Sequence, residues 1–212
     1  MQLSLAGAKD IEQVLYTHEH VDHINGIAEF EFYVRLRSQK PLPIYAGSHT
    51  LFAIAERFAF MANELEPHQI EAWQILEFDG VRYTALPATH GIQTFGYLIE
   101  KTAETEQAEQ KNKRIAYFPD TALPSPEVLE QLQDIDILII DATFYGRNWM
   151  PASHLTVEEA IALAKQLRAK KTFLTHLSMH YDEPITALEL QELLAPYKGD
   201  ILVANDGLEL SF

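Results

Sequence analysis

Residues 17–23 read T-H-E-H-V-D-H, and this histidine-rich loop decides the fold that we expect of the chain. It follows a short apolar run, Val14 to Tyr16, that we predict to be a strand. Imidazole and carboxylate together suit zinc, with manganese, iron or nickel as alternatives. A single histidine is more often a packed or solvated residue than a ligand, and the density of this cluster favours metal binding. The loop contributes four candidate ligands: His18, His20, Asp22 and His23.

The spacing inside the loop allows for two cations. Alternate residues of an extended segment point the same way, so His18 and His20 are placed to hold one ion. Where the chain then turns, Asp22 and His23 are carried toward a second ion. We therefore expect two divalent metal ions, zinc or manganese in the first instance.

Composition indicates an ordinary globular protein. The 212 residues are 47% hydrophobic and 22% charged, which suits one domain spanning 1–212. No apolar run is long enough to cross a membrane, and the first ten residues do not resemble a secretory signal, so we expect a cytoplasmic protein without a membrane partner. The absence of cysteine excludes disulfides, thiolate ligands and a cysteine nucleophile.

The charge balance of the chain indicates which partners and substrates it can bind. With 31 acidic and 16 basic residues the formal net charge is -15, which repels phosphate backbones at long range. Extended nucleic acid is therefore a disfavoured partner. A small anionic phosphate ester remains suitable, because bound divalent cations reverse the local field inside a site.

Further candidate ligands follow other predicted strands. In layered α/β folds the strand ends converge on one rim, where ligands gather. Residues 73–78 and 81–86 predict a hairpin through Asp79-Gly80, and Thr156 with Glu159 predicts a capping box. The segment 28–37 fits a strand or a helix, and 101–113 is expected to be a polar hairpin insertion. The candidates at strand ends are His90, Asp120, Asp141 and His176.

The remaining histidines and two aspartates beside glycines lack such a setting. We interpret the histidines as surface or packing residues, and the aspartates as turn formers. These residues are His49, His68, His180, Asp79 and Asp206.

The order of motifs resembles that of the metallo-β-lactamase-fold hydrolases. The motifs are T-H-E-H-V-D-H, P-A-T-H-G, F-P-D-T, I-I-D-A-T-F and L-T-H-L-S. The stretches I-I-D-A-T-F, S-H-L-T-V-E-E-A and L-T-H-L-S are most similar to the phosphodiesterase branch, which includes the cyclic-phosphate phosphodiesterase of phosphonate breakdown and, more distantly, the tRNA 3′-end endonuclease ribonuclease Z. The closing N-D-G-L-E-L also resembles the end of the former enzyme.

This resemblance implies a four-layer αβ/βα sandwich with a dinuclear site on one edge. It implies that His18, His20 and His90 hold the first metal, and that Asp22, His23 and His176 hold the second. Asp120 would bridge them. A metal-bridging hydroxide would attack phosphorus. The implied catalytic residues are His154, as general acid or phosphate hydrogen-bond donor, Asp141, which orients it, and Asp22.

One departure from the family pattern concerns the N-terminus. Family members ordinarily begin with several strands before the histidine-rich loop, whereas 17 residues precede His18 here. Strands missing from a sheet leave apolar surface and an edge uncovered. We expect either a shortened chain or a homo-oligomer in which a neighbouring copy covers the gap.

The sequence leaves three functions in competition. The first is a metal-dependent phosphodiesterase acting on a small or cyclic phosphate ester. The second is tRNA 3′ processing, which the acidic balance opposes. The third is a non-catalytic metal-binding protein of the same fold. A thioesterase or lactamase function would give no role to Asp141 and His154.

Overall fold

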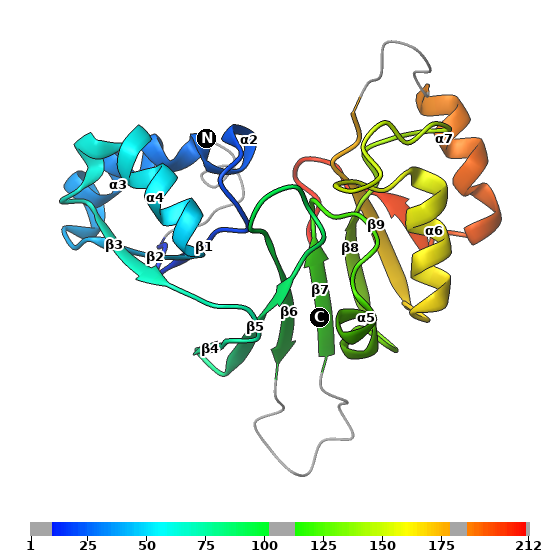
Figure 1. The fold of residues 1–212 in the computed structure, drawn as a ribbon, viewed down its shortest axis with the longest axis horizontal. Helices are drawn as coiled ribbons and strands as arrows, with labels where there is room; N and C mark the ends of the chain where they lie inside the picture. Colours follow the sequence, from blue (N-terminus) through cyan, green and yellow to red (C-terminus); the bar gives the residue numbers. More distant parts are fainter. Residues whose placement is uncertain (1–9, 102–112, 179–185, 211–212) are drawn as a thin grey trace. The chain divides into compact units, whose positions relative to one another are not determined.

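The computed structural model describes residues 10–101, 113–178 and 186–210, which divide into two compact units. The first unit comprises residues up to 72 together with 92–95, and the second comprises 73–91 and the chain from 96 onward. Each unit combines a sheet with helices, as expected of an α/β fold (Figure 1). The single domain expected over 1–212 remains a prediction.

The first unit contains a three-stranded parallel sheet in the order β1-β2-β3. The strands are β1 (Val14–Leu15), β2 (Leu42–Ala46) and β3 (Leu65–Gln69). Helices lie over one face of this sheet (Figure 1). They are α2 (Val21–Ile24), η1 (Asn25–Glu29), α3 (Phe30–Tyr33), η2 (Val34–Ser38), α4 (Ser48–Arg57) and η3 (Ala59–Met61).

A small apolar core holds the helices of the first unit onto its sheet. Ile44 of β2 is buried against Ile54 of α4 and against Ile24 and Ile27, which follow the histidine-rich loop. Burial of an isoleucine side chain contributes about 1.5–3 kcal/mol. The loop is therefore fixed at both ends, by β1 before it and by these two isoleucines after it.

The second unit contains a seven-stranded sheet in the order β10-β9-β8-β7-β6-β5-β4. The pairs β4/β5 and β6/β7 are antiparallel, whereas β7 to β10 run parallel. The strands are β4 (Ile75–Phe78), β5 (Val81–Pro87), β6 (Phe95–Lys101), β7 (Lys113–Phe118), β8 (Ile137–Asp141), β9 (Lys171–Thr175) and β10 (Ile201–Val203). The helices are α5 (Pro126–Gln131), α6 (Val157–Gln166), α7 (Ala187–Leu194) and η4 (Ala195–Tyr197).

Strand β8 shows why the parallel part of this sheet is so apolar. Leu138 and Ile140 are buried in the main core with α5, α6 and α7, while Ile137 belongs to a second cluster with Phe173. Both faces of β8 are thus covered, as its continuous apolar run predicts. The carboxyl ends of β7, β8 and β9 meet at one edge, and each leads into a candidate site residue.

Several local predictions are confirmed. The Asp79-Gly80 turn joins β4 to β5 with positive φ at both residues, +48° and +73°, as a two-residue hairpin requires. The capping box of α6 is present, with Thr156 accepting from the Glu159 amide. The open segment 28–37 is helical. The insertion expected at 101–113 lies outside the described residues except for Lys101 and Lys113, which pair across β6 and β7.

Strand β3 was not predicted, because its sequence L-E-P-H-Q carries no apolar alternation. Its placement depends instead on pairing with β2 along all five residues. In the part of the chain that the structure describes, every helix is too short or too polar to span a bilayer.

Candidate metal centre and active site

The histidine-rich loop of the first unit brings its ligand candidates together in pairs. The chain stays extended after β1, because Tyr16 donates to the Tyr45 carbonyl and Thr17 accepts from the Phe95 amide. The buried His18 then places its Nε2 3.0 Å from Nδ1 of His20. Two imidazole nitrogens at this separation are close enough to be ligands of one ion.

The second half of the loop forms another pair. The helix α2 starts at Val21, so the chain turns between the two halves of the motif as its spacing predicts. Nε2 of His23 lies 3.3 Å from Oδ2 of Asp22, and the His23 and His18 rings lie 4.2 Å apart. The first unit therefore presents a His–His pair and an Asp–His pair side by side.

In the second unit Asp120 is placed between two histidines. It follows β7 and is almost completely buried. Its Oδ1 lies 3.1 Å from Nε2 of His176, and its Oδ2 lies 3.9 Å from Nε2 of His90. Burial and, after it, the negative charge of Asp120 raise the pKa of Tyr117, so this phenol remains neutral. Each oxygen of the Asp120 carboxylate thus faces a different imidazole.

The Nδ1 atoms of His90 and His176 form hydrogen bonds of their own. These bonds leave the Nε2 atoms of both rings facing Asp120 as acceptors. Nδ1 of His90 lies 2.9 Å from the Ser153 carbonyl, which only accepts, so Nδ1 carries the proton. In the neutral ring Nε2 then presents a lone pair toward the carboxylate. Nδ1 of His176 is similarly bonded to the Thr143 hydroxyl at 2.8 Å. Lone pairs facing a carboxylate call for a cation between them, so these residues fit a divalent metal.

A second buried pair lies beside these ligands. Nδ1 of His154 donates to Oδ2 of Asp141 at 2.7 Å, and the His154 ring stacks on His176 at 5.3 Å and meets His90 edge-on at 4.9 Å. Asp141 is fully buried, and it also accepts hydrogen bonds from the Thr121 and Thr143 amides. The structure therefore brings the two residues of this predicted catalytic pair together.

Thr143 is a functional candidate that sequence reasoning missed. Its hydroxyl donates to Oδ1 of Asp141 at 2.8 Å and lies 2.8 Å and 3.1 Å from the Nδ1 atoms of His176 and His154. One side chain thus contacts a candidate ligand and both members of the catalytic pair. Threonine is common at strand ends, so the residue type alone did not identify Thr143. The one available signal was its position in I-I-D-A-T-F, two residues after Asp141.

The backbone at His176 is strained. This residue ends β9 with φ of +59°, in the left-handed region that costs a non-glycine residue about 1–2 kcal/mol. Such strain persists where the surroundings hold it, and it clusters at functional sites. Here it turns the chain at the sheet edge, where the His176 imidazole faces Asp120.

The histidines interpreted as surface or packing residues are placed accordingly, so far as they are described. His49 is exposed, and His68 stacks on Tyr45 with 4.7 Å between the rings. His180 lies outside the described residues. Asp79 forms the hairpin turn, and Asp206 is exposed in the turn before Gly207, which has φ of +81°.

Comparisons with known proteins agree with this chemistry. A family model described as a beta-lactamase superfamily domain matches residues 1–177. The ribonuclease Z of Pyrobaculum calidifontis is 30% identical over 213 residues, covering 86% of this chain and 74% of that protein. The ribonuclease Z of Archaeoglobus fulgidus is 22% identical over 262 residues, covering 100% of this chain and 85% of that protein.

A solved structure is similar over almost the whole chain. It is a diphosphatase from the PhnP family, with a TM-score of 0.78 and 26% identity, covering 99% of this chain and 75% of that one. The family model and this similarity confirm the fold that the motifs implied. The chain belongs to the metallo-β-lactamase superfamily and is a metal-dependent hydrolase.

Proposed function

We propose that this protein is a dinuclear metal-dependent phosphodiesterase that acts on a small or cyclic phosphate ester. The observation that carries the proposal is the placement of Asp120, whose two oxygens face the Nε2 atoms of His90 and His176. A carboxylate that serves two imidazoles in this way suits two cations better than one.

In this proposal seven residues would hold the two ions. The His18–His20 pair and His90 would hold the first ion, and the Asp22–His23 pair and His176 would hold the second. Asp120 would serve as a ligand of both. The close pairing of the candidate ligand atoms in the loop, and the Nε2 atoms of His90 and His176 that face Asp120, support this assignment. Zinc or manganese suits the five imidazoles, with iron or nickel as alternatives.

When bound, two such ions supply Lewis acidity and lower the pKa of a shared water. The protein's own contribution is to orient and protonate. Asp141 accepts a hydrogen bond from Nδ1 of His154 and so fixes the direction of the ring. Nε2 of His154 is then the donor toward the phosphate. A protonated His154 then gives its Nε2 proton to the leaving oxygen, which contributes about 10²–10⁴-fold to the rate.

Similarity to a diphosphatase of the PhnP family supports phosphorus chemistry. The acidic balance of the chain favours a small substrate, because a net charge of -15 disfavours a long phosphate backbone. The second candidate is tRNA 3′ processing, which is favoured by the repeated match to proteins named ribonuclease Z. Cleavage of a precursor tRNA at physiological salt would select this candidate.

The test is hydrolysis of bis-p-nitrophenyl phosphate and of nucleoside cyclic phosphates by the zinc- and manganese-loaded protein. We expect His154→Ala to lower kcat by about 10²–10⁴-fold while metal content, measured by mass spectrometry, stays at the wild-type value. His68→Ala is the matched control, since this histidine stacks on Tyr45 and should leave kcat unchanged. Absence of turnover with either metal, or full activity in His154→Ala, would refute the assignment.

A further inference from the structure

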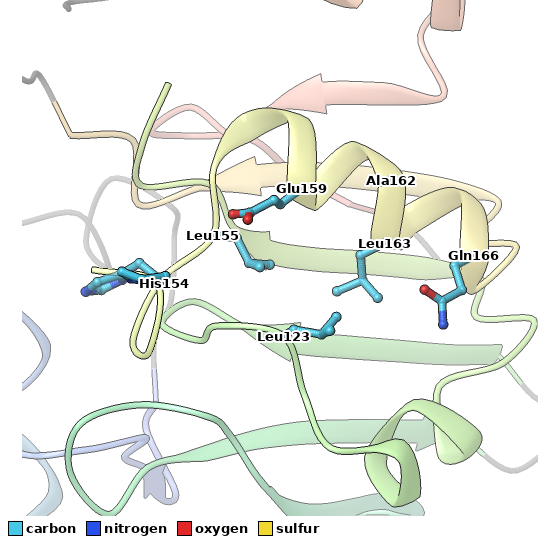
Figure 2. A pocket seen from close by; sticks show the side chains of 8 residues that line it. Leu123, His154, Leu155, Glu159, Ala162, Leu163 and Gln166 are labelled. Atoms are coloured by element: carbon cyan, nitrogen blue, oxygen red, sulfur yellow. The ribbon is translucent and has the colours of Figure 1, made fainter. Parts of the chain in front are cut away.

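A pocket of about 220 Å³ lies along helix α6 in the second unit (Figure 2). His154 and Glu159 lie at one end of it and Gln166 at the other, with Leu123, Leu155 and Leu163 between them. None of the sequence motifs assigns a function to this pocket. One of its lining residues is His154, which the proposed function assigns to the leaving oxygen.

The walls of the pocket select for an apolar, compact group. Leu155 and Leu163 are buried in the core beneath it, while Leu123 is 57% exposed and forms the opposite wall. A cavity of about 150 Å³ lined by such side chains accommodates a benzene ring. The space along α6 is therefore sufficient for one flat ring with a substituent.

The ends of the pocket select for hydrogen-bonding groups without negative charge. Oε2 of Glu159 accepts from the Thr156 amide and from Asn148, whereas Oε1 accepts no hydrogen bond within the described part of the chain. The Gln166 amide likewise bonds to none of the described residues. Apart from His154, no cationic side chain lines the pocket, and the Glu159 carboxylate disfavours a phosphate beside it.

We propose that this pocket binds the organic group of the substrate, as an uncharged flat ring bearing N–H or O–H donors. The inference rests on the proposed function, because His154 is there assigned to the leaving oxygen and the attached group must lie within a few bonds of that oxygen. The ring packs between Leu123 and Leu163, and its donors reach Oε1 of Glu159 or the Gln166 amide. The phosphate remains at the metal ligands.

Ala162 offers a direct way to close the pocket. It lines the pocket from the exposed side of α6, so a larger side chain is accommodated by the helix but occupies the space for the ring. Ala162→Phe is therefore the test variant. Glu158→Phe is the matched control, because Glu158 is exposed one turn earlier on the same helix and does not line the pocket.

The first measurement is steady-state hydrolysis of bis-p-nitrophenyl phosphate, whose rings are flat and uncharged. We expect Ala162→Phe to raise KM by about tenfold with kcat within about twofold of wild type, the size of discrimination that a small apolar pocket supplies. Glu158→Phe should leave both constants unchanged. An unchanged KM in Ala162→Phe would overturn the proposal.

The second measurement does not depend on activity. Thymine, a flat uncharged ring with N–H donors, is titrated into the metal-loaded protein while the methyl resonances of Leu163 are followed by NMR. We expect a saturable shift in wild type and in Glu158→Phe, and none in Ala162→Phe. Inorganic phosphate serves as the probe of the metal centre and should bind all three proteins equally.

The two measurements separate the two proposals. Saturable thymine binding without any diester turnover would refute the proposed function and leave the ring pocket standing. Turnover with an unchanged KM and no shift at Leu163 would refute the ring pocket alone. A change of oligomeric state in Ala162→Phe, seen by size-exclusion chromatography, with an unchanged KM would also overturn it and would assign the pocket to a second copy of the chain.

Discussion

The hydroxyl of Thr143 connects the candidate ligand His176 to the pair formed by Asp141 and His154. Hydrogen bonds of this kind fix the tautomer and direction of a metal-binding imidazole, and their loss typically costs 10- to 100-fold in metal affinity or activity. The role of Thr143 in the proposed centre is therefore to hold Nε2 of His176 toward Asp120.

Thr143→Val removes the hydroxyl but preserves the shape of the side chain. We expect it to weaken metal binding by about 10- to 100-fold, measured by competition with a chromophoric chelator. Thr143→Ser should restore most of the affinity, because it keeps the oxygen. If valine and serine at this position gave the same affinity, Thr143 would have a packing role only.

At the residue scale the sequence indicated the candidate ligands more readily than the residues that support them. Histidines and aspartates at strand ends are recognisable by type, and His90, Asp120 and His176 do lie together in the second unit. The carbonyl of Ser153 and the hydroxyl of Thr143 are not recognisable, because their roles come from folding residues that lie far apart in sequence. The positive φ of His176 also leaves no trace in residue type.

Strands β7, β8 and β9 are joined near their starts by Asp136. Its carboxylate accepts from the Arg114 amide at 2.9 Å and from Lys170 at 2.5 Å. Although burial by itself raises the pKa of Asp136, the hydrogen bonds from Lys170 and Arg114 and the charges of Lys170 and Lys113 outweigh it, so the pKa lies below the ordinary 3.8. The ionised carboxylate therefore stabilises the folded state.

Because the folded pKa is lowered, this contribution is complete above the unfolded value and is lost as the pH falls through the folded value. We expect Asp136→Asn to reduce the free energy of unfolding at pH 7 by about 1–2 kcal/mol, measured by urea titration. The difference in the free energy of unfolding between the wild type and Asp136→Asn should disappear once the pH falls below the folded pKa of Asp136. Asp134→Asn, which alters a mostly exposed pair with Arg168, is the control and should change the free energy little.

At the element scale, local chemistry explains which elements were predictable. The capping box of α6 and the Asp79-Gly80 turn are encoded in adjacent residues and were confirmed. Strand β3 has no such local signal, and its extended form accompanies its pairing with β2. The seven-strand order of the larger sheet likewise depends on packing of whole elements.

The charge of the whole molecule affects how an anionic substrate approaches it. A net charge of -15 repels a phosphodiester, and salt shortens the range of that repulsion from about 30 Å at 0.01 M to about 8 Å at 0.15 M. We expect kcat/KM for bis-p-nitrophenyl phosphate to rise over this range of ionic strength. A marked fall would indicate phosphate binding by a basic surface, as nucleic-acid processing requires.

The central claim at the scale of the whole molecule is that the seven candidate ligands hold two ions. The most direct test is anomalous diffraction from crystals of the zinc- or manganese-loaded protein. We predict two peaks about 3.5–4 Å apart, with Asp120 contacting both ions and with His18 and His90 on one and His23 and His176 on the other. A single peak, or two peaks that lie away from Asp120, would contradict the account.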